Sequence, residues 1–591
     1  MLSYFKQFVN ESSLFRQMAD SLKGRGGLRI WLIWANVFLV FFLILFSNIG
    51  VLPVKNVGDF VFFAVIILLF SLYRPGWAFL FFVGTIALEN VNLVPKELGL
   101  AVRPYQLLGA ASLVAVVIRY FTKRLSFALP KWNWIDTLIL VFASSGFVSA
   151  LASSISKGVA IKQSVVVFSF VALYFLTRIF IQEFKDLKKI IPYFLSSSVV
   201  VILFGIWQNW RFVRGLSNFE VMPGRPNATF AEADWLGIYL VFLLSVVYSL
   251  ITYFNKVINN SESGIFNFQF SIFKQFSITK LQNFKFNQNS KFKIQNLFLY
   301  LILTAVYILL ILTVARSAWL GAGAVSVLFF VFCVWYYFKN KNSKILWIPA
   351  FTGMTLVLAI LIIKVFGLTN FELGNRIQST GSGLQEITIS CLSASKIDPE
   401  LVISDAKELE QYGCRHINLE EIESEESMGN FVARVKRNDP NVNIRAEIYQ
   451  SSWEQIKVHP ILGIGWGNIS QILGTDDLGH GLNASNIFLE IWLGAGLIGF
   501  LSFLIILGNI VLRIFNFQFS ILKQFSKSND SILKLDNSDL NQDSKFKIKN
   551  FSAWNLFLML SLFAIIVPNL FNSGIMLGFL WVYLAIVQIK Q

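Results

Sequence analysis

The chain has 591 residues, of which 55% are hydrophobic, 16% aromatic and only 14% charged, and its mean hydropathy is +0.62. These proportions exclude a set of soluble domains and are typical of a polytopic membrane protein. The net charge of +16 does not indicate nucleic acid as a partner, because excess Lys and Arg in a membrane protein gather in the cytoplasmic loops.

Apolar runs of about 20 residues, the length that crosses a bilayer core, recur along the whole chain. They predict an all-α fold, a polytopic bundle of about fourteen transmembrane helices. The first residues are polar and basic without a small-residue cleavage site, so no cleavable signal peptide is predicted. The apolar runs centre near residues 30–50, 57–73, 76–93, 103–120, 134–154, 159–181, 189–210, 234–254, 297–315, 317–338, 346–366, 486–512, 552–570 and 573–590.

Loop charge predicts the orientation of these spans in the cytoplasmic membrane. With the basic N-terminus inside and strict alternation, every loop on the inner side is basic, as the positive-inside rule requires. The basic residues of these loops are Lys123, Arg124, Lys185, Lys188, Lys189, Lys256, Lys339, Lys341 and Lys344. The predicted organisation is a cytoplasmic N-terminus (1–28), transmembrane helices (29–254, 297–366, 486–512 and 552–591), cytoplasmic insertions (255–296 and 513–551) and one extracytoplasmic loop (367–485).

The large outer loop, about Phe366–Ser485, carries 17 Asp and Glu against 9 Lys and Arg. Its middle, Ile397–Glu426, has apolar spacing compatible with helices and resembles a small soluble subdomain, or else a solvated insertion. Cys391 and Cys414 share this loop and could form a disulfide if it is extracytoplasmic, although spacing alone cannot show that they meet.

Two predicted cytoplasmic loops contain nearly the same sequence. IFNFQFSIFKQFS (Ile265–Ser277) returns as IFNFQFSILKQFS (Ile514–Ser526), and NSKFKIQN (Asn289–Asn296) returns as DSKFKIKN (Asp543–Asn550). Alternating Phe with Lys and Asn is compatible with an amphipathic segment on the inner leaflet. Near-identity within dissimilar surroundings favours a duplicated insertion instead.

Ionisable residues at the rim of a span are functional candidates, because they are costly to place in a membrane. Arg316, at the outer end of a helical hairpin, either extends to lipid headgroups or clamps an anion, since guanidinium binds phosphate bidentately. Arg225 stands on the same outer face. Glu232 and Asp234 begin the next span and are as compatible with helix capping as with function.

The stretch Arg445–Phe500 brings a polar helical segment to His459-Pro460, a glycine-rich turn and a loop with His480, just before an apolar run. Histidine titrates near neutrality and can accept a proton from a hydroxyl nucleophile. His416 is interpreted as a surface residue, and His459 as the end of a helix. No metal site, Walker motif or nucleotide loop is recognisable, so no metal or cofactor is expected.

Four segments in order resemble the O-antigen ligase and polymerase family of polytopic membrane glycosyltransferases, over about Pro192–Gly499. RPNATFAEADWLGIYL resembles its Arg…Gly-Thr-Phe…Asn-x-Leu segment, and TVARSAWLG its Thr-x-Ser-Arg-x-x-Trp hairpin. VHPILGIGWGN resembles its His-Pro-Leu-x-Gly-x-Gly turn. SNIFLEIWLGAGLIG resembles the start of its His-Asn helix.

The resemblance implies a metal-independent transfer of a glycan from undecaprenyl pyrophosphate to an acceptor hydroxyl on a glycan, lipid or protein, at the outer face of the membrane. Arg316 and Arg225 would bind the pyrophosphate, with Arg445 and Glu232 also in the substrate site, and His480 would be the base. Ser485 stands where many members have the His of the His-Asn pair, so His480 is its substitute here.

Two further departures are Asp234 in place of the family's Asn and Ala315 in place of its Ser. The resemblance leaves ligation and polymerisation open. A transporter of lipid-linked glycans and a catalytically inactive scaffold are the other hypotheses. Transporters tend to show repeated spans and broken midplane helices. Here no repeated span is visible, and the polar residues gather on one face.

Overall fold

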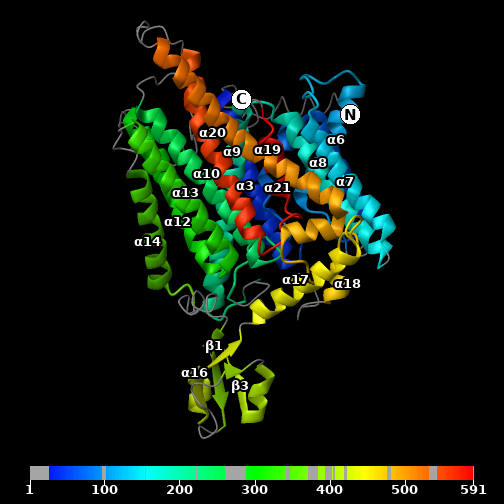
Figure 1. Ribbon diagram of the computed structural model, residues 1–591, viewed down its shortest axis with the longest axis vertical. Coiled ribbons are helices and arrows are strands. Elements are labelled where there is room, and N and C mark those ends of the chain that lie inside the picture. The colour runs from blue at the N-terminus through cyan, green and yellow to red at the C-terminus, as the bar shows by residue number, and fades with distance from the viewer. Residues whose placement is uncertain are drawn as a thin grey trace, which may run out of the picture.

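The computed structural model describes residues 25–95, 101–153, 155–217, 219, 224–259, 288–340, 347–369, 384–392, 402–403, 406–417, 422–438, 440–474, 481–531 and 542–589. Its helices form one bundle, and a small group of strands lies beyond one end of it (Figure 1). Nine helices within these ranges are long and apolar enough to cross a membrane, and four shorter apolar helices accompany them. The protein is therefore an all-α, multi-pass membrane protein, as its composition predicts.

The first eight described helices precede the first long gap in these ranges. They are α3 (Arg25–Ile49), α4 (Val57–Tyr73), α5 (Pro75–Thr85), α6 (Pro104–Phe121), α7 (Trp134–Ala152), α8 (Lys157–Phe180), α9 (Phe184–Val213) and α10 (Ala233–Asn259). The bundle is completed by α12 (Gln288–Leu312), α13 (Arg316–Asn340), α14 (Trp347–Phe366), α19 (Ile487–Ser531), α20 (Gln542–Asn569) and α21 (Gly578–Ile586).

Side-chain caps set where several helices begin. The amide oxygen of Asn56 accepts from the backbone N–H of Asp59 at the start of α4, and Asn133 does the same for Asp136 at the start of α7, both at 2.9 Å. In each case the Asp carboxylate accepts the cap residue's own N–H in return. These reciprocal bonds satisfy backbone donors that would otherwise be unpaired at the helix end.

Two of the predicted spans are helical for only part of their length. The run near 76–93 is helical only in α5, and the run near 573–590 only in α21. A buried carboxylate joins the two breaks: Glu89 accepts from the backbone N–H of Gly578 and from the Tyr105 hydroxyl, each at 2.8 Å, and pairs with Arg103 at 2.8 Å. Irregular backbone is tolerated at membrane depth only where protein surrounds it and satisfies it.

The glycine-rich turn that follows α17 (Pro440–Val458) docks onto a break in α19. Gly496 interrupts α19 with φ +66, and there Leu497 donates to the carbonyl of Ile461 at 2.9 Å. Gly463 has φ +68, and a β-carbon there would lie 2.4 Å from the carbonyl oxygen of Leu493. Both positions require glycine because of their φ and the close backbone contact. The turn thus fastens the outer segment to the bundle.

The middle of the large outer loop forms a compact unit that contains strands. The strands β1 (Leu384–Cys391), β2 (Val402–Ile403), β3 (Cys414–His416) and β4 (Phe431–Asn438) form one sheet in the order β2-β4-β1-β3. Within 397–426, the described helical parts are η4 (Ala406–Tyr412) and α16 (Ile422–Ser427), as the apolar spacing predicts, whereas β2 and β3 are strands that it did not predict. The prediction of a small folded subdomain agrees with this structure.

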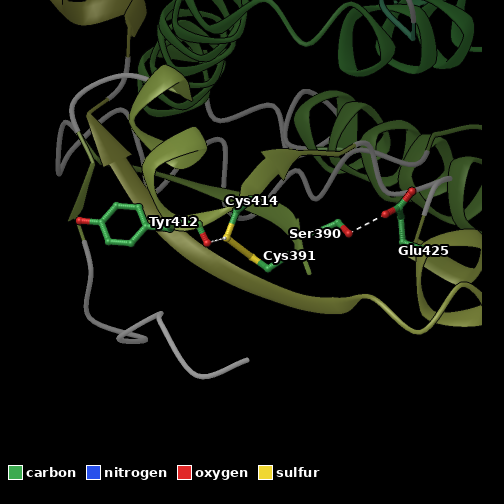
Figure 2. Close-up of a disulfide and its surroundings, with 5 residues drawn as sticks. All are labelled: Ser390, Cys391, Tyr412, Cys414 and Glu425. Atoms are coloured by element: carbon green, nitrogen blue, oxygen red, sulfur yellow. Dashed lines mark hydrogen bonds between the residues drawn. A yellow bond between two sulfur atoms is a disulfide. The ribbon is translucent and has the colours of Figure 1, made fainter. Parts of the chain in front are cut away.

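Cys391 and Cys414 are joined in a disulfide (Figure 2). They are register partners on the antiparallel pair β1 and β3, so sheet pairing brings them together. The sequence had left this pairing open.

Three of the four duplicated segments lie in described helices: Asn289–Asn296 in α12, Ile514–Ser526 in α19 and Asp543–Asn550 in α20. Ile265–Ser277 is among the residues left out, whereas Ile514–Ser526 continues α19, which ends only at Ser531. The backbone of one copy is therefore an extension of a membrane helix. Whether either copy has a role stays a prediction.

Candidate functional site

Arg225 lies at the turn between α12 and α13, although 88 residues separate it from that turn in the chain. Its Nε donates to the carbonyl oxygen of Thr313 at 3.1 Å. Its terminal nitrogen pairs with Asp234 at 3.1 Å, with the two side chains 18% and 24% exposed. The guanidinium is therefore held by two partners while part of it still reaches the surface, a geometry that suits anion binding.

Three hydrogen bonds hold the segment that follows Arg225 in place. The Gln208 side chain of α9 accepts from the N–H of Ala228 at 2.8 Å. The Thr229 hydroxyl donates to the carbonyl of Ala87 at 2.6 Å, and the carbonyl of Thr229 accepts from the N–H of Asn90 at 2.7 Å. The irregular segment that contains Glu89 is thus the support against which the arginine segment packs.

Arg316 is the first residue of α13, three residues after the Thr313 carbonyl that Arg225 binds. Val314 between them has φ +52, a left-handed conformation that closes the hairpin in three residues. The next residue, Ser317, is 4% exposed and accepts a hydrogen bond from the Asn572 amide at 3.1 Å. Asn572 belongs to the segment between α20 and α21, so the C-terminal part of the chain supports the first turn of α13.

The same C-terminal segment contacts the polar helix α17. The Tyr449 hydroxyl lies 3.2 Å from the carbonyl of Ser485 and 3.3 Å from that of Leu570. The Asn486 amide also donates to Leu570, at 2.9 Å. Burial raises the pKa of Tyr449 despite the opposing positive charge of Arg445, one helical turn earlier, so the hydroxyl remains a proton donor at neutral pH.

These contacts link the described site residues into one connected region. Arg225 and Arg316 share a turn, Arg316 adjoins Ser317, and the 570–577 segment continues to the helix that carries Arg445. Glu232 lies beside this region at the start of α10, where its carbonyl accepts from Leu236. Asp234, two residues further on, forms an ion pair with Arg225.

The predictions made for His480 and His459 have different outcomes in the structure. His480 lies outside the described residues, so its role as a base stays a prediction. His459 directly follows the last residue of α17, and its N–H donates to Gln455. This position agrees with its interpretation as a helix end.

The sequence did not identify Tyr449, Asn486 or Asn572 as candidates. The one available signal was NLFNSG, a polar stretch between two apolar runs that contains the buried Asn569, Asn572 and Ser573. Polar side chains at membrane depth are functional candidates by default, so this stretch could have been singled out. Within the described ranges, no three His, Cys, Asp or Glu side chains gather as metal ligands.

The apolar helices define a class, the multi-pass membrane proteins, and the hydrogen bonds above bring arginines and polar side chains of several segments together in this one. Residues 299–504 match the profile of the family described as O-antigen ligase. This match covers the helical hairpin with Arg316, the outer loop and the first part of α19, and it supports the resemblance of the chain to the O-antigen ligase family. No curated protein and no solved structure matches the chain.

Proposed function

We propose that the protein transfers an undecaprenyl-pyrophosphate-linked glycan onto an acceptor hydroxyl at the outer face of the cytoplasmic membrane. The family match supports a ligase or polymerase type of function in general. The two activities differ in the acceptor, a different molecule for a ligase and a second lipid-linked glycan for a polymerase. Ligation is the function proposed here.

In the proposed reaction the acceptor oxygen attacks the anomeric carbon of the donor sugar, and a new C–O bond forms there. The bond from that carbon to the pyrophosphate oxygen breaks, and lipid pyrophosphate leaves with the electron pair. His480 takes the proton of the acceptor hydroxyl. Arg225 and Arg316 hold the pyrophosphate, on which negative charge grows as the bond breaks.

The observation that carries this proposal is the convergence of two arginines on one turn. Arg225 reaches that turn through the Thr313 carbonyl, and Arg316 begins the helix that follows it. Two guanidinium groups at a membrane rim suit a diphosphate, because each can bind phosphate oxygens bidentately without losing its proton. The disulfide in the adjoining subdomain also supports an extracytoplasmic location, since disulfides persist in oxidising compartments.

The test is Arg316→Lys, which keeps the positive charge and loses the planar fork. We expect glycan transfer to fall by about 100- to 1000-fold, the typical loss when a preorganised donor is removed. Transfer is measured in membranes with purified lipid-linked donor and acceptor. Arg119→Lys is the matched control, because Arg119 binds the backbone carbonyls of Leu72 and Tyr73 far from the proposed site. Full activity of Arg316→Ala would overturn the assignment.

The second variant, His480→Ala, removes the proposed general base. Loss of a general base typically costs about 100- to 10000-fold in rate, while donor binding, supported by the arginines, should change little. His459→Ala is the control, because His459 ends a helix. Normal transfer by His480→Ala would place the base elsewhere, and movement of the donor lipid without transfer would favour a transporter.

A further inference from the structure

A cavity of about 160 Å³ lies inside the bundle, away from the arginine region. It is enclosed mainly by α9, α10, α20 and α21, and its walls are hydrocarbon and aromatic almost throughout. The lining side chains include Leu187, Phe242, Phe254, Trp554 and Phe579. A cavity of about this size with such walls excludes water and takes apolar molecules instead.

The cavity is about one membrane leaflet deep. Its lining residues on α10 run from Phe242 to Phe254, which corresponds to about 18 Å at 1.5 Å per residue. Half of a bilayer's hydrocarbon core is about 15 Å. The lining residues on α9 begin at Phe184, in its first turn, and end at Leu195. The cavity therefore reaches from one membrane surface to about the midplane.

The surface at which it opens is the one that loop charge predicts to be cytoplasmic. Lys188 is the charged residue among the described lining residues. Arg29 of α3 donates to the backbone carbonyl of Lys188 at 2.6 Å, which puts a second cation beside the opening. The neighbouring Lys185 and Lys189 pair with Glu183 and Asp186, at 2.6 and 2.8 Å. Basic pockets between transmembrane helices on this side recognise anionic headgroups.

We propose that this cavity binds an acyl chain of an anionic phospholipid from the cytoplasmic leaflet, with the headgroup phosphate beside Lys188 and Arg29. Apolar walls one leaflet deep match a hydrocarbon chain, and the cations at the opening match the phosphate. The site is separate from the proposed transfer site, because α9 begins at this cavity and reaches the Arg225 segment only at Gln208. The proposal does not rest on the proposed transfer reaction.

The experiment is native mass spectrometry of the purified full chain with phosphatidylglycerol or phosphatidylethanolamine added in detergent. We expect a bound phospholipid with preference for phosphatidylglycerol. Lys188→Gln should lower that preference about five-fold, the contribution of one basic side chain near an anionic surface. Lys189→Gln is the matched control, because Lys189 lies on the same turn, pairs with Asp186 and does not line the cavity.

Two further variants test the apolar part of the site. Val246→Trp fills the cavity from α10, and Ser249→Leu is a smaller change in the same wall. Each should reduce bound phospholipid while leaving the unfolding temperature of the lipid-free protein within a few degrees. Equal binding of both lipids by the wild type and Lys188→Gln would overturn the proposal, as would retention of a polyprenyl lipid instead. Binding that starts only after deletion of residues 260–287 would identify this chain as the occupant and equally overturn it.

Discussion

Arg225 and Arg316 illustrate how the position of a side chain depends on its backbone partners. Arg225 is fixed by a carbonyl from one helical hairpin and by a carboxylate from its own segment. The Asp234 carboxylate and the Thr313 carbonyl thus hold the Arg225 guanidinium beside the turn between α12 and α13.

We predict that Asn572 affects the transfer reaction by positioning Ser317, with which it forms a hydrogen bond. Asn572→Ala leaves the buried Ser317 hydroxyl without this donor, and such a loss costs about 1–3 kcal/mol. If that cost falls on the first turn of α13, transfer should slow by about ten-fold at an unchanged level of protein in the membrane. The measurement is the rate of glycan transfer, with Asn48→Ala as control, because Asn48 bonds only to the Ile44 carbonyl of its own helix.

A double variant decides whether Asn572 works through Ser317. Residues that act through one contact are not additive, so Asn572→Ala combined with Ser317→Ala should be no slower than the worse single variant. Additive losses would mean that the two residues act separately. A fully active Asn572→Ala would contradict a positioning role for this segment.

Among the elements, the sheet unit of the outer loop is stabilised by a carboxylate as well as by its disulfide (Figure 2). Glu425 of α16 accepts from the Ser390 hydroxyl at 2.5 Å, from Asn430 at 2.8 Å and from Arg415 at 2.6 Å. The Ser390 bond, followed by those from Asn430 and Arg415, lowers the pKa of Glu425. The charged form is thus the one that the folded unit prefers.

This lowered pKa predicts how the stability of the unit depends on pH. Because the folded pKa is below the unfolded one, the stabilisation is complete above about pH 4.3 and is lost as the pH falls through the folded value. Glu425→Gln should therefore be less stable than the wild type at neutral pH, and the difference should vanish in acid. Limited proteolysis of the outer loop between pH 7 and pH 3 measures it. Glu426→Gln, at an exposed neighbour, should not change the profile.

The arrangement of the whole molecule predicts which residues are accessible from outside the cell. The sheet unit with α16 lies beyond one end of the bundle (Figure 1), and its Ser427 is exposed. Ser528, near the end of α19, belongs to a loop predicted to be cytoplasmic. Ser427→Cys should react with an impermeant thiol reagent on intact cells, and Ser528→Cys only after permeabilisation. Labelling of Ser528→Cys from outside would contradict the predicted topology.

Hydropathy and charge along the chain were enough for the class and the positions of most helices, and four short motifs carried the family resemblance. This follows because a helix that crosses a membrane must be apolar over about 20 consecutive residues, which is a local property of the sequence. Arg225 and Arg316 could likewise be singled out, since a charge at the rim of an apolar run is locally visible. The helix α17 and the turn after it were predicted on the same local grounds.

Only the tertiary structure decided which of these pieces meet. The Asn572–Ser317 bond joins residues 255 apart, and the Arg225–Thr313 bond joins residues 88 apart. Apolar helices present similar surfaces to one another, so hydropathy does not specify their neighbours. Hydropathy also did not predict the ends of the helices near Glu89 and Gly578. These breaks are stabilised by a hydrogen bond between the buried Glu89 carboxylate and a distant segment of the chain. In the outer loop, the pairing of β1 with β3 brought Cys391 and Cys414 together, which their spacing alone could not show.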